Sequence, residues 1–524
     1  MKLEYSSTPV RSNALAAMVV GVITVAVVVV FLVKLQSLLA WRYTSDLFIY
    51  DQAMSETLKG NIGVEYTYGN VFGGHAYFVL FLLLPLKWLL GPYCAHALLA
   101  LSPLVFGVTA AVLLKNTYGK GAPRAYSLAS LGVFLLTYGI WQGLHERVYG
   151  FHPDVLSGFL LVAYTSLRVM PRDGSLERRG WLKQASWALV PLLLFLLLKE
   201  EMIFLGIIYF GVAAIFRRSV NDLLSAVFCC CALIASVVFM RIFHSPFHDV
   251  AKSVDSIGPV LRAMLALDPR GLIETYWSLA FWVPVILYSA AFLLLVSVSK
   301  RRLGYAIALF VTGLVKLFAA AAVGDLNLFS WHGFPGLVML SGALVIQCGA
   351  AGCFPSRFEK RFVYCLFGLS VVMFVLTDLP FGVRTALSGR FGRKNIVIVQ
   401  QALRELKASV EPEKVTAIPQ YTAIEWVDGY RFSSFPRGTY RVPSGIAEYA
   451  VVERSNTELS PHLEFVPLSG EAPAYSAYRL RGYKVIDAND HFILLKRDGS
   501  SLHNSQRDVF VGLFGSESLG KKGP

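Results

Sequence analysis

The stretch ALAAMVVGVITVAVVVVFLVKLQSLLAWRYTSDLFIYDQAMSETLKGN, residues 14–61, passes from a long apolar run into a much more polar segment. The apolar part, residues 14–40, is long enough to cross a bilayer as a helix. It is too long for the apolar part of a signal peptide, and no small-residue cleavage site follows it. We therefore expect a retained first membrane span, with the polar segment beginning where the chain leaves the membrane.

The composition of the whole chain extends this interpretation. Of 524 residues, 55% are hydrophobic and only 16% are charged, and the mean hydropathy is +0.55. Apolar segments of span length recur from Asn13 to Thr377, without the alternation of a membrane β-barrel. The predicted fold class is an all-α polytopic membrane protein with about eleven transmembrane helices, counted by span length. The seven cysteines include no CxxC pair, which argues against a disulfide framework or a zinc knuckle.

The charges predict the topology. The net charge of +14 comes from lysines and arginines that concentrate in alternate loops, the pattern of cytoplasmic loops. We expect a multi-pass protein of the cytoplasmic membrane with a cytoplasmic N-terminus and a first outer loop at residues 41–92. Membrane lipids account for the positive surplus, and no nucleic-acid partner is expected. The run from His75 to Leu90 is short and interrupted at Pro85 and Lys87, which predicts an interfacial or re-entrant helix.

The composition changes near Thr385, where apolar runs shorten and charges of both signs appear. Residues 1–384 are the predicted transmembrane domain, 385–510 a small extracytoplasmic α/β domain, and 511–524 a disordered tail. Within the α/β domain we expect a strand or turn leading into a helix in residues 395–410, strands at 413–419 and 447–454, and a helix followed by a strand pair in 475–499. No phosphate-binding glycine fingerprint occurs there, so no chemistry is assigned to it.

The polar segment after the first span has the period of an amphipathic helix. Thr44, Ser45 or Asp46 can cap this helix, and Gly60 can end it. The pattern predicts a helix on the outer surface, with Asp46 either as a helix cap or as a functional acid. The apolar side would carry Leu47, Tyr50, Met54 and Leu58, and the solvated side Asp51, Gln52, Ser55, Glu56 and Lys59.

The chain carries four motifs that together resemble a known family: SDLFIYDQAM (45–54), GGHAYFVLFLLLPLKWLLGP (73–92), YGFHPDVLSGFLLVAY (149–164) and LLLKEEMIFLGIIYFG (196–211). They look like the motifs of an uncharacterised prokaryotic family of multi-spanning membrane proteins, a domain of unknown function. The order of its parts resembles the GT-C superfamily of integral-membrane glycosyltransferases, which take sugars from polyprenyl-phosphate donors on the outer face. The resemblance extends from about Tyr43 to beyond Val452.

The resemblance implies roles for individual residues. GT-C enzymes carry an acidic residue in the first outer loop shortly after the first span, and Asp46 stands there as the candidate catalytic base. Lys199 and Arg147 lie at outer membrane ends and are candidate partners of the donor phosphate. Many members carry Lys-Pro-Pro in the first outer loop and Lys-Gly-Pro after a later span. Here the corresponding places read GGHAYF and KEEM, and only Lys199 is kept.

Further polar residues at outer membrane ends are candidate substrate contacts. His145, His152 and Asp154 could surround a divalent metal ion if their loop folds back, although the spacing matches no standard zinc pattern. The alternative is that His152 and Asp154 cap the following helix. The charges of KEE are either functional or the turn of an interfacial hairpin. The full set of candidate substrate contacts is Asp51, His75, Arg147, His152, Asp154, Lys199, Glu200 and His332.

These features favour a glycosyltransferase that moves a hexosyl or pentosyl group from a polyprenyl-phosphate sugar lipid to a lipid, glycan or protein acceptor. No cofactor is required by the sequence, apart from the metal-ion alternative. A transporter or flippase of a lipid-linked or polar substrate is the first alternative, but its expected mid-membrane polar breaks and internal repeat are not evident. A non-catalytic membrane assembly protein that uses the exported tail is the second.

Overall fold

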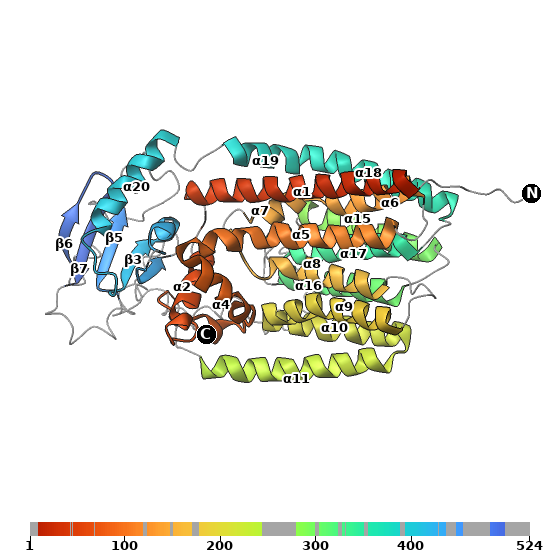
Figure 1. Cartoon of the computed structure of the whole chain (residues 1–524), viewed down its shortest axis with the longest axis horizontal. Helices are drawn as coiled ribbons and strands as arrows, with labels where there is room; N and C mark the ends of the chain where they lie inside the picture. Colours follow the sequence, from red (N-terminus) through yellow and green to blue (C-terminus); the bar gives the residue numbers. More distant parts are fainter. Residues whose placement is uncertain are drawn as a thin grey trace, which may run out of the picture.

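The computed structural model describes residues 9–41, 43, 46–67, 69–118, 123–146, 150–169, 178–243, 279–298, 303–322, 327–330, 332–350, 355–387, 393–427, 429–435, 447–453 and 483–497. Long helices run side by side and form one elongated bundle, with a small sheet at one end and the N-terminus at the other (Figure 1). The bundle helices are α1 (Pro9–Leu39), α5 (Cys94–Tyr118), α6 (Arg124–Leu135), α8 (Val155–Val169), α9 (Arg178–Leu198), α10 (Glu200–Arg217), α11 (Val220–Ile242), α15 (Leu279–Val298), α16 (Gly304–Ala322), α17 (Phe334–Ala350), α18 (Arg357–Leu376) and α19 (Asp378–Leu387).

The helices have the composition of a membrane protein. Within the described residues, six stretches are long and apolar enough to cross a membrane: Ala16–Leu39, Val79–Thr117, Val220–Ile242, Phe281–Val298, Gly304–Ala321 and Arg357–Val383. Shorter apolar helices cover Val155–Val169, Trp187–Leu198 and Phe334–Gly349. The structure therefore has fewer full-length candidate spans than the about eleven helices that the sequence predicts.

Short elements lie between the bundle and the sheet (Figure 1). The apolar run after His75 does form a separate short helix, but α4 begins only at Val79, after α3 and a tight turn. Asn70 caps α3 by accepting a hydrogen bond from the backbone N–H of Phe72, at 2.9 Å. The elements are α2 (Asp46–Leu58), β1 (Val64–Glu65), β2 (Gly69–Asn70), α3 (Val71–Gly74), α4 (Val79–Leu90), η1 (Gly91–Tyr93) and α7 (Ile140–His145).

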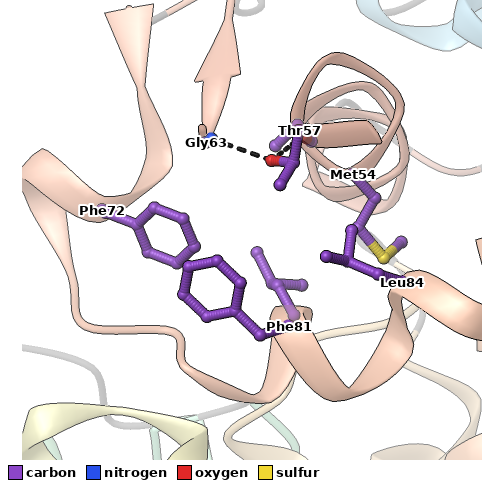
Figure 2. Close-up of a pocket in the computed structure, with 8 residues that line it drawn as sticks. Met54, Thr57, Gly63, Phe72, Phe81 and Leu84 are labelled. Carbon is purple, nitrogen blue, oxygen red and sulfur yellow. Dashed lines mark hydrogen bonds between the residues drawn. The ribbon is translucent and has the colours of Figure 1, made fainter. Parts of the chain in front are cut away.

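An apolar pocket between α2, α3 and α4 shows how these elements are fixed to one another (Figure 2). The rings of Phe72 and Phe81 stack there with their centroids 4.9 Å apart. The Thr57 hydroxyl accepts a hydrogen bond from the backbone N–H of Gly63 at 2.9 Å. Because α3 and α4 both pack on α2, the turn between them, residues 75–78, is held beside α2.

Helix α2 differs from the predicted surface helix. Its polar face is not solvated, because Asp51, Gln52 and Glu56 are buried. Lys87 of α4 donates to Asp51 Oδ2 at 2.7 Å, and the side-chain amide of Gln52 donates to the carbonyl of Phe432 at 3.0 Å. The prediction of a solvated side was wrong for these three residues, which α4 and the C-terminal sheet cover, whereas Lys59 is exposed as predicted.

The C-terminal part forms a five-stranded sheet in the order β4-β3-β5-β7-β6. Strand β3 is parallel to β4 and β5, whereas β7 is antiparallel to both β5 and β6. Leu403 of α20 and Trp426 belong to its buried core. The helix expected in residues 475–482 and the tail 511–524 lie outside the described residues. The elements are α20 (Arg393–Lys407), β3 (Thr416–Pro419), η2 (Gln420–Glu425), β4 (Phe432–Phe435), β5 (Tyr449–Glu453), β6 (Tyr483–Ala488) and β7 (Phe492–Arg497).

The sheet is joined to the membrane part at α1 and α2. Besides the bond from Gln52, Arg431 Nε lies 3.7 Å from Glu56 Oε1. Gln400 of α20 donates to the carbonyl of Leu39, at the end of α1, at 3.3 Å. The bundle end that carries α2 therefore also carries the sheet.

Candidate functional site

Ionisable and aromatic side chains from distant parts of the chain meet at the bundle end nearest the sheet. They come from α2, the turn before α4, the loop before α8, the start of α10, the middle of α16 and the turn before α17. We call this group the polar cluster. Its members are Asp46, Tyr50, His75, Tyr77, His152, Asp154, Lys199, Glu200, Glu201, Lys316 and His332.

Two lysines and two acids form the floor of the polar cluster. Lys199 Nζ lies 3.4 Å from Asp154 Oδ2 and 3.8 Å from Glu201 Oε2. Lys316 of α16 pairs with the other oxygen of Glu201. The side chains of Asp154, Lys199 and Lys316 are at most 5% exposed. Charges held this deep are costly unless paired, and the alternation of lysine and acid supplies that pairing.

A second group of the polar cluster, which we call the rim, connects Glu200 to the turn before α4. Glu200 Oε1 lies 2.8 Å from His75 Nδ1, and Glu200 Oε2 accepts from the backbone N–H of Ala76 at 2.9 Å. The side chains of His75 and Glu200 are 27% and 16% exposed. Both glutamates of KEE stand in the first turn of α10, where the helix dipole favours negative charge. The sequence KEE thus places one acid at the rim and one at the floor.

Aromatic rings line one side of the polar cluster. The rings of Tyr50 and Tyr77 meet edge to face, with centroids 5.3 Å apart. The Tyr77 hydroxyl lies 3.5 Å from His152 Nε2, and Lys199 Nζ lies 6.0 Å from the centroid of the Tyr77 ring. The phenol of Tyr77 therefore stands between the imidazole and the ammonium.

The surroundings set the charge states of these groups. Burial, followed by the charge of Lys199, lowers the pKa of His152 well below its usual value, so the ring is neutral near pH 7. Burial lowers the pKa of Lys199, but Asp154 and Glu201 outweigh that effect, and the net shift of this pKa is upward. Burial raises the pKa of Tyr77 well above its usual value. The cluster thus combines a neutral imidazole, a protonated amine and a phenol that stays a donor.

Asp46 is the first residue of α2 and is half-buried. Its carboxylate is close enough to the two tyrosines to contribute to the upward pKa shifts of Tyr50 and Tyr77, which burial dominates. Thr44 and Ser45 lie outside the described residues. The candidate base therefore belongs to the polar cluster, on the same side as the aromatic rings.

Other predicted site residues are not in the cluster. Asp51 pairs with Lys87 and is 1% exposed. His145 Nε2 lies 3.0 Å from the Ser37 hydroxyl, toward α1. Arg147 lies outside the described residues.

The expected metal site is not assembled. In the part of the chain that the structure describes, no group of three or more His, Cys, Asp or Glu side chains could hold a metal ion. The set of His145, His152 and Asp154 fails because the His145 ring faces Ser37, whereas Asp154 contacts Lys199. Among the described residues, no hydrogen bond joins the Asp154 side chain to the first turn of α8. The backbone carbonyl of Asp154 accepts a hydrogen bond from the Ser157 hydroxyl at 2.6 Å.

Four residues of the polar cluster are not among the site residues predicted from the sequence: Tyr50, Tyr77, Glu201 and Lys316. A signal existed for Lys316, which interrupts the apolar run GYAIALFVTGLVKLFAAAA of α16. An ionisable residue inside a span is a functional candidate by default. The tyrosines gave no such signal, because aromatic residues at membrane interfaces are common.

No protein-family model matches the sequence, and no curated protein matches it. One similar solved structure is ArnT from Cupriavidus metallidurans bound to undecaprenyl phosphate, at 13% identity and a TM-score of 0.49, covering 92% of this chain and 98% of that chain. Another is the Archaeoglobus fulgidus oligosaccharyltransferase tethered with an acceptor peptide, at 11% identity and a TM-score of 0.46, covering 82% of this chain and 69% of that chain. The likeness to both structures extends over most of this chain.

Proposed function

We propose that this protein is a membrane glycosyltransferase that moves a sugar from a polyprenyl phosphate to an acceptor hydroxyl at the outer membrane face. The observation that supports the proposal is the polar cluster itself, in which the half-buried carboxylate of Asp46 and the buried ammonium of Lys199 both lie near the Tyr50 and Tyr77 rings, at the end of an apolar bundle. A lipid-linked donor needs an apolar environment for its tail and a polar site at the helix ends for its headgroup. The described architecture offers both.

In the proposed reaction Asp46 is the general base. It takes the proton of the acceptor hydroxyl while the hydroxyl oxygen bonds to the anomeric carbon of the sugar. The bond between that carbon and the donor phosphate oxygen breaks, and polyprenyl phosphate leaves with the bonding electron pair. The products are the glycosylated acceptor, the released lipid phosphate and a protonated Asp46, which returns its proton to water.

Lys199 is the proposed partner of the departing phosphate. Its pKa is shifted upward by Asp154 and Glu201, so it remains a cation where negative charge develops on the phosphate. Arg147 is the second proposed phosphate partner. The neutral His152 and the rim residues His75, Glu200 and His332 are the proposed contacts to the sugar or the acceptor, together with Asp154.

The test is transfer by the purified protein in liposomes that contain polyprenyl-phosphate sugars with a labelled sugar. We expect label in a new product and an equal amount of released polyprenyl phosphate, with no transfer from nucleotide sugars or in liposomes without protein. Label that crosses the bilayer still attached to the intact lipid would overturn the proposal in favour of a flippase. If no donor is cleaved and no donor crosses the bilayer, the result would favour an assembly role.

A further inference from the structure

A buried ion pair lies next to the polar cluster and ties it to the first span. Lys34 of α1 is fully buried, and its ammonium lies 2.8 Å from Glu146 Oε2. The same ammonium donates to the Ser102 hydroxyl at 2.7 Å and to the Leu144 carbonyl at 2.9 Å. A lysine has three N–H donors, and this site uses all of them: on Ser102 of α5, on Leu144 of α7 and on Glu146, which directly follows α7.

Glu146 uses its second oxygen on the loop that leads to α8. Glu146 Oε1 accepts from the backbone N–H of His152 at 2.6 Å. The carbonyl of Glu146 also accepts from the N–H of Gly150, at 2.9 Å. Glu146 has a φ of 47°, in the left-handed region that a non-glycine residue seldom adopts. One side chain thus connects the first span to the peptide of residue 152.

The same loop is pressed against the segment that precedes Asp46. A Cβ at Gly150, where φ is +73°, would lie 2.8 Å from the Tyr43 ring. The Tyr43 hydroxyl donates to the carbonyl of His145 at 3.3 Å. The backbone of the loop is therefore fixed from two sides, by Tyr43 and by the carboxylate of Glu146.

This anchoring sets the direction of two cluster side chains. His152 Nε2 reaches the Tyr77 hydroxyl at 3.5 Å, and Asp154 Oδ2 reaches Lys199 at 3.4 Å. The side chain of Glu146 binds Lys34, Ser102 and the backbone of His152. Its influence on the cluster runs through the peptide of His152.

We propose that Glu146 is a positioning residue for the transfer reaction: by accepting from the His152 N–H it holds His152 and Asp154 against Tyr77 and Lys199. This inference rests on the proposed function. Small misplacements of reacting groups cost rate out of proportion to their size, so a site needs such a second set of contacts. The competing explanation is that the Lys34 and Glu146 pair only stabilises the fold.

Two double variants separate these explanations. Lys34→Met/Glu146→Gln and Lys34→Met/Glu146→Leu both remove the two buried charges, which apolar groups can often replace without loss of folding. The glutamine keeps a carbonyl oxygen for the His152 N–H, whereas the leucine does not. Their difference therefore reports the hydrogen bond to His152 and not the ion pair. Glu146→Met in the same background is a second acceptor-free variant, in case the leucine double does not fold.

The readouts are steady-state transfer and hydrogen exchange of the peptide that contains the His152 amide. We expect the glutamine double to keep kcat within about 3-fold of the wild type, and the leucine double to lose about 10- to 100-fold in kcat with little change in KM. The His152 amide should exchange faster in the leucine double. Equal kcat values in two folded doubles would overturn the inference, as would equal exchange.

Failure of the proposed function gives a different result. In that case the wild type transfers no sugar, while the exchange comparison still shows whether the side chain at position 146 holds the loop. Slower exchange in the glutamine double would then support the positioning of His152, and equal exchange would refute it, independently of any transfer activity.

Discussion

Replacing Asp46 by asparagine is expected to lower kcat for sugar transfer by about 100- to 10,000-fold, the usual contribution of a general base. Asparagine has nearly the same shape as aspartate, so α2 should still begin at this residue. The thermal midpoint and the KM for the donor should stay close to the wild-type values. The loss would then belong to the chemical step.

The control for this prediction is an acid of the same type outside the polar cluster. Asp490 is exposed in the turn between β6 and β7, and Asp490→Asn should transfer at the wild-type rate. Initial rates of both variants in the same liposomes provide the comparison. If Asp46→Asn is folded and as active as Asp490→Asn, Asp46 has only a structural role in the first turn of α2, and the proposed mechanism loses its base.

Replacing Lys87 by methionine is expected to lower the free energy of unfolding by about 3–5 kcal/mol, the usual cost of removing one partner of a buried ion pair. Lys87 donates to Asp51 Oδ2 at 2.7 Å, and Asp51 is 1% exposed. The variant leaves the Asp51 carboxylate buried beside an apolar side chain. Denaturant titration of the purified protein in detergent measures the change in the free energy of unfolding.

Lys59 offers the matched control for Lys87. It pairs with Glu56 at 2.9 Å on the same helical segment, but its side chain is 51% exposed. Glu56 is buried, but it keeps the side-chain amide of Asn61 at 2.9 Å and Arg431 at 3.7 Å when the exposed Lys59 is replaced, so Lys59→Met should cost at most about 1 kcal/mol. Equal effects of Lys87→Met and Lys59→Met would contradict the structural role assigned to Asp51. A folded Asp51→Asn/Lys87→Met double should recover much of the loss.

The contrast between Asp46 and Asp51 shows what the sequence of α2 could predict. The 3.6-residue period correctly indicates a helix, which runs from Asp46 to Leu58. The period also predicts a solvated polar face, and that was wrong because Lys87 and Phe432 cover it. These partners lie 36 and 380 residues away along the chain, so no local pattern could reveal them.

The sequence predicted some residues of the polar cluster, but not the long-range contacts between them. Charges between two apolar runs pointed to Lys199 and Glu200, and the acidic and imidazole residues of the loop before α8 pointed to Asp154. Spacing alone did not show that the His145 ring faces Ser37, and so the metal set failed. The bond between Glu146 and Lys34 joins residues 112 positions apart, and a lysine inside the first span was its only signal in the sequence.

The number of membrane spans was harder to predict than the positions of the helices. Hydropathy shows that a segment is apolar, but it does not give the length of the helix directly. Helices α8 and α17 are apolar but short, and most of their side chains are buried inside the bundle. A helix that is covered by its neighbours has an apolar sequence whether or not it is long enough to cross alone. Counting apolar runs therefore gave more spans than the described helices of full length.

The most direct test of the central claim is to find where the donor headgroup binds. A polyprenyl phosphate with a photoreactive group at the phosphate end is cross-linked to the wild type in liposomes, with and without excess unlabelled polyprenyl phosphate, and the labelled peptides are identified by mass spectrometry. The account predicts competed labelling of peptides that contain Asp46, His75, His152 or Lys199. Competed labelling confined to the opposite end of the bundle, near Arg168 and Arg217, or to the C-terminal sheet would contradict it.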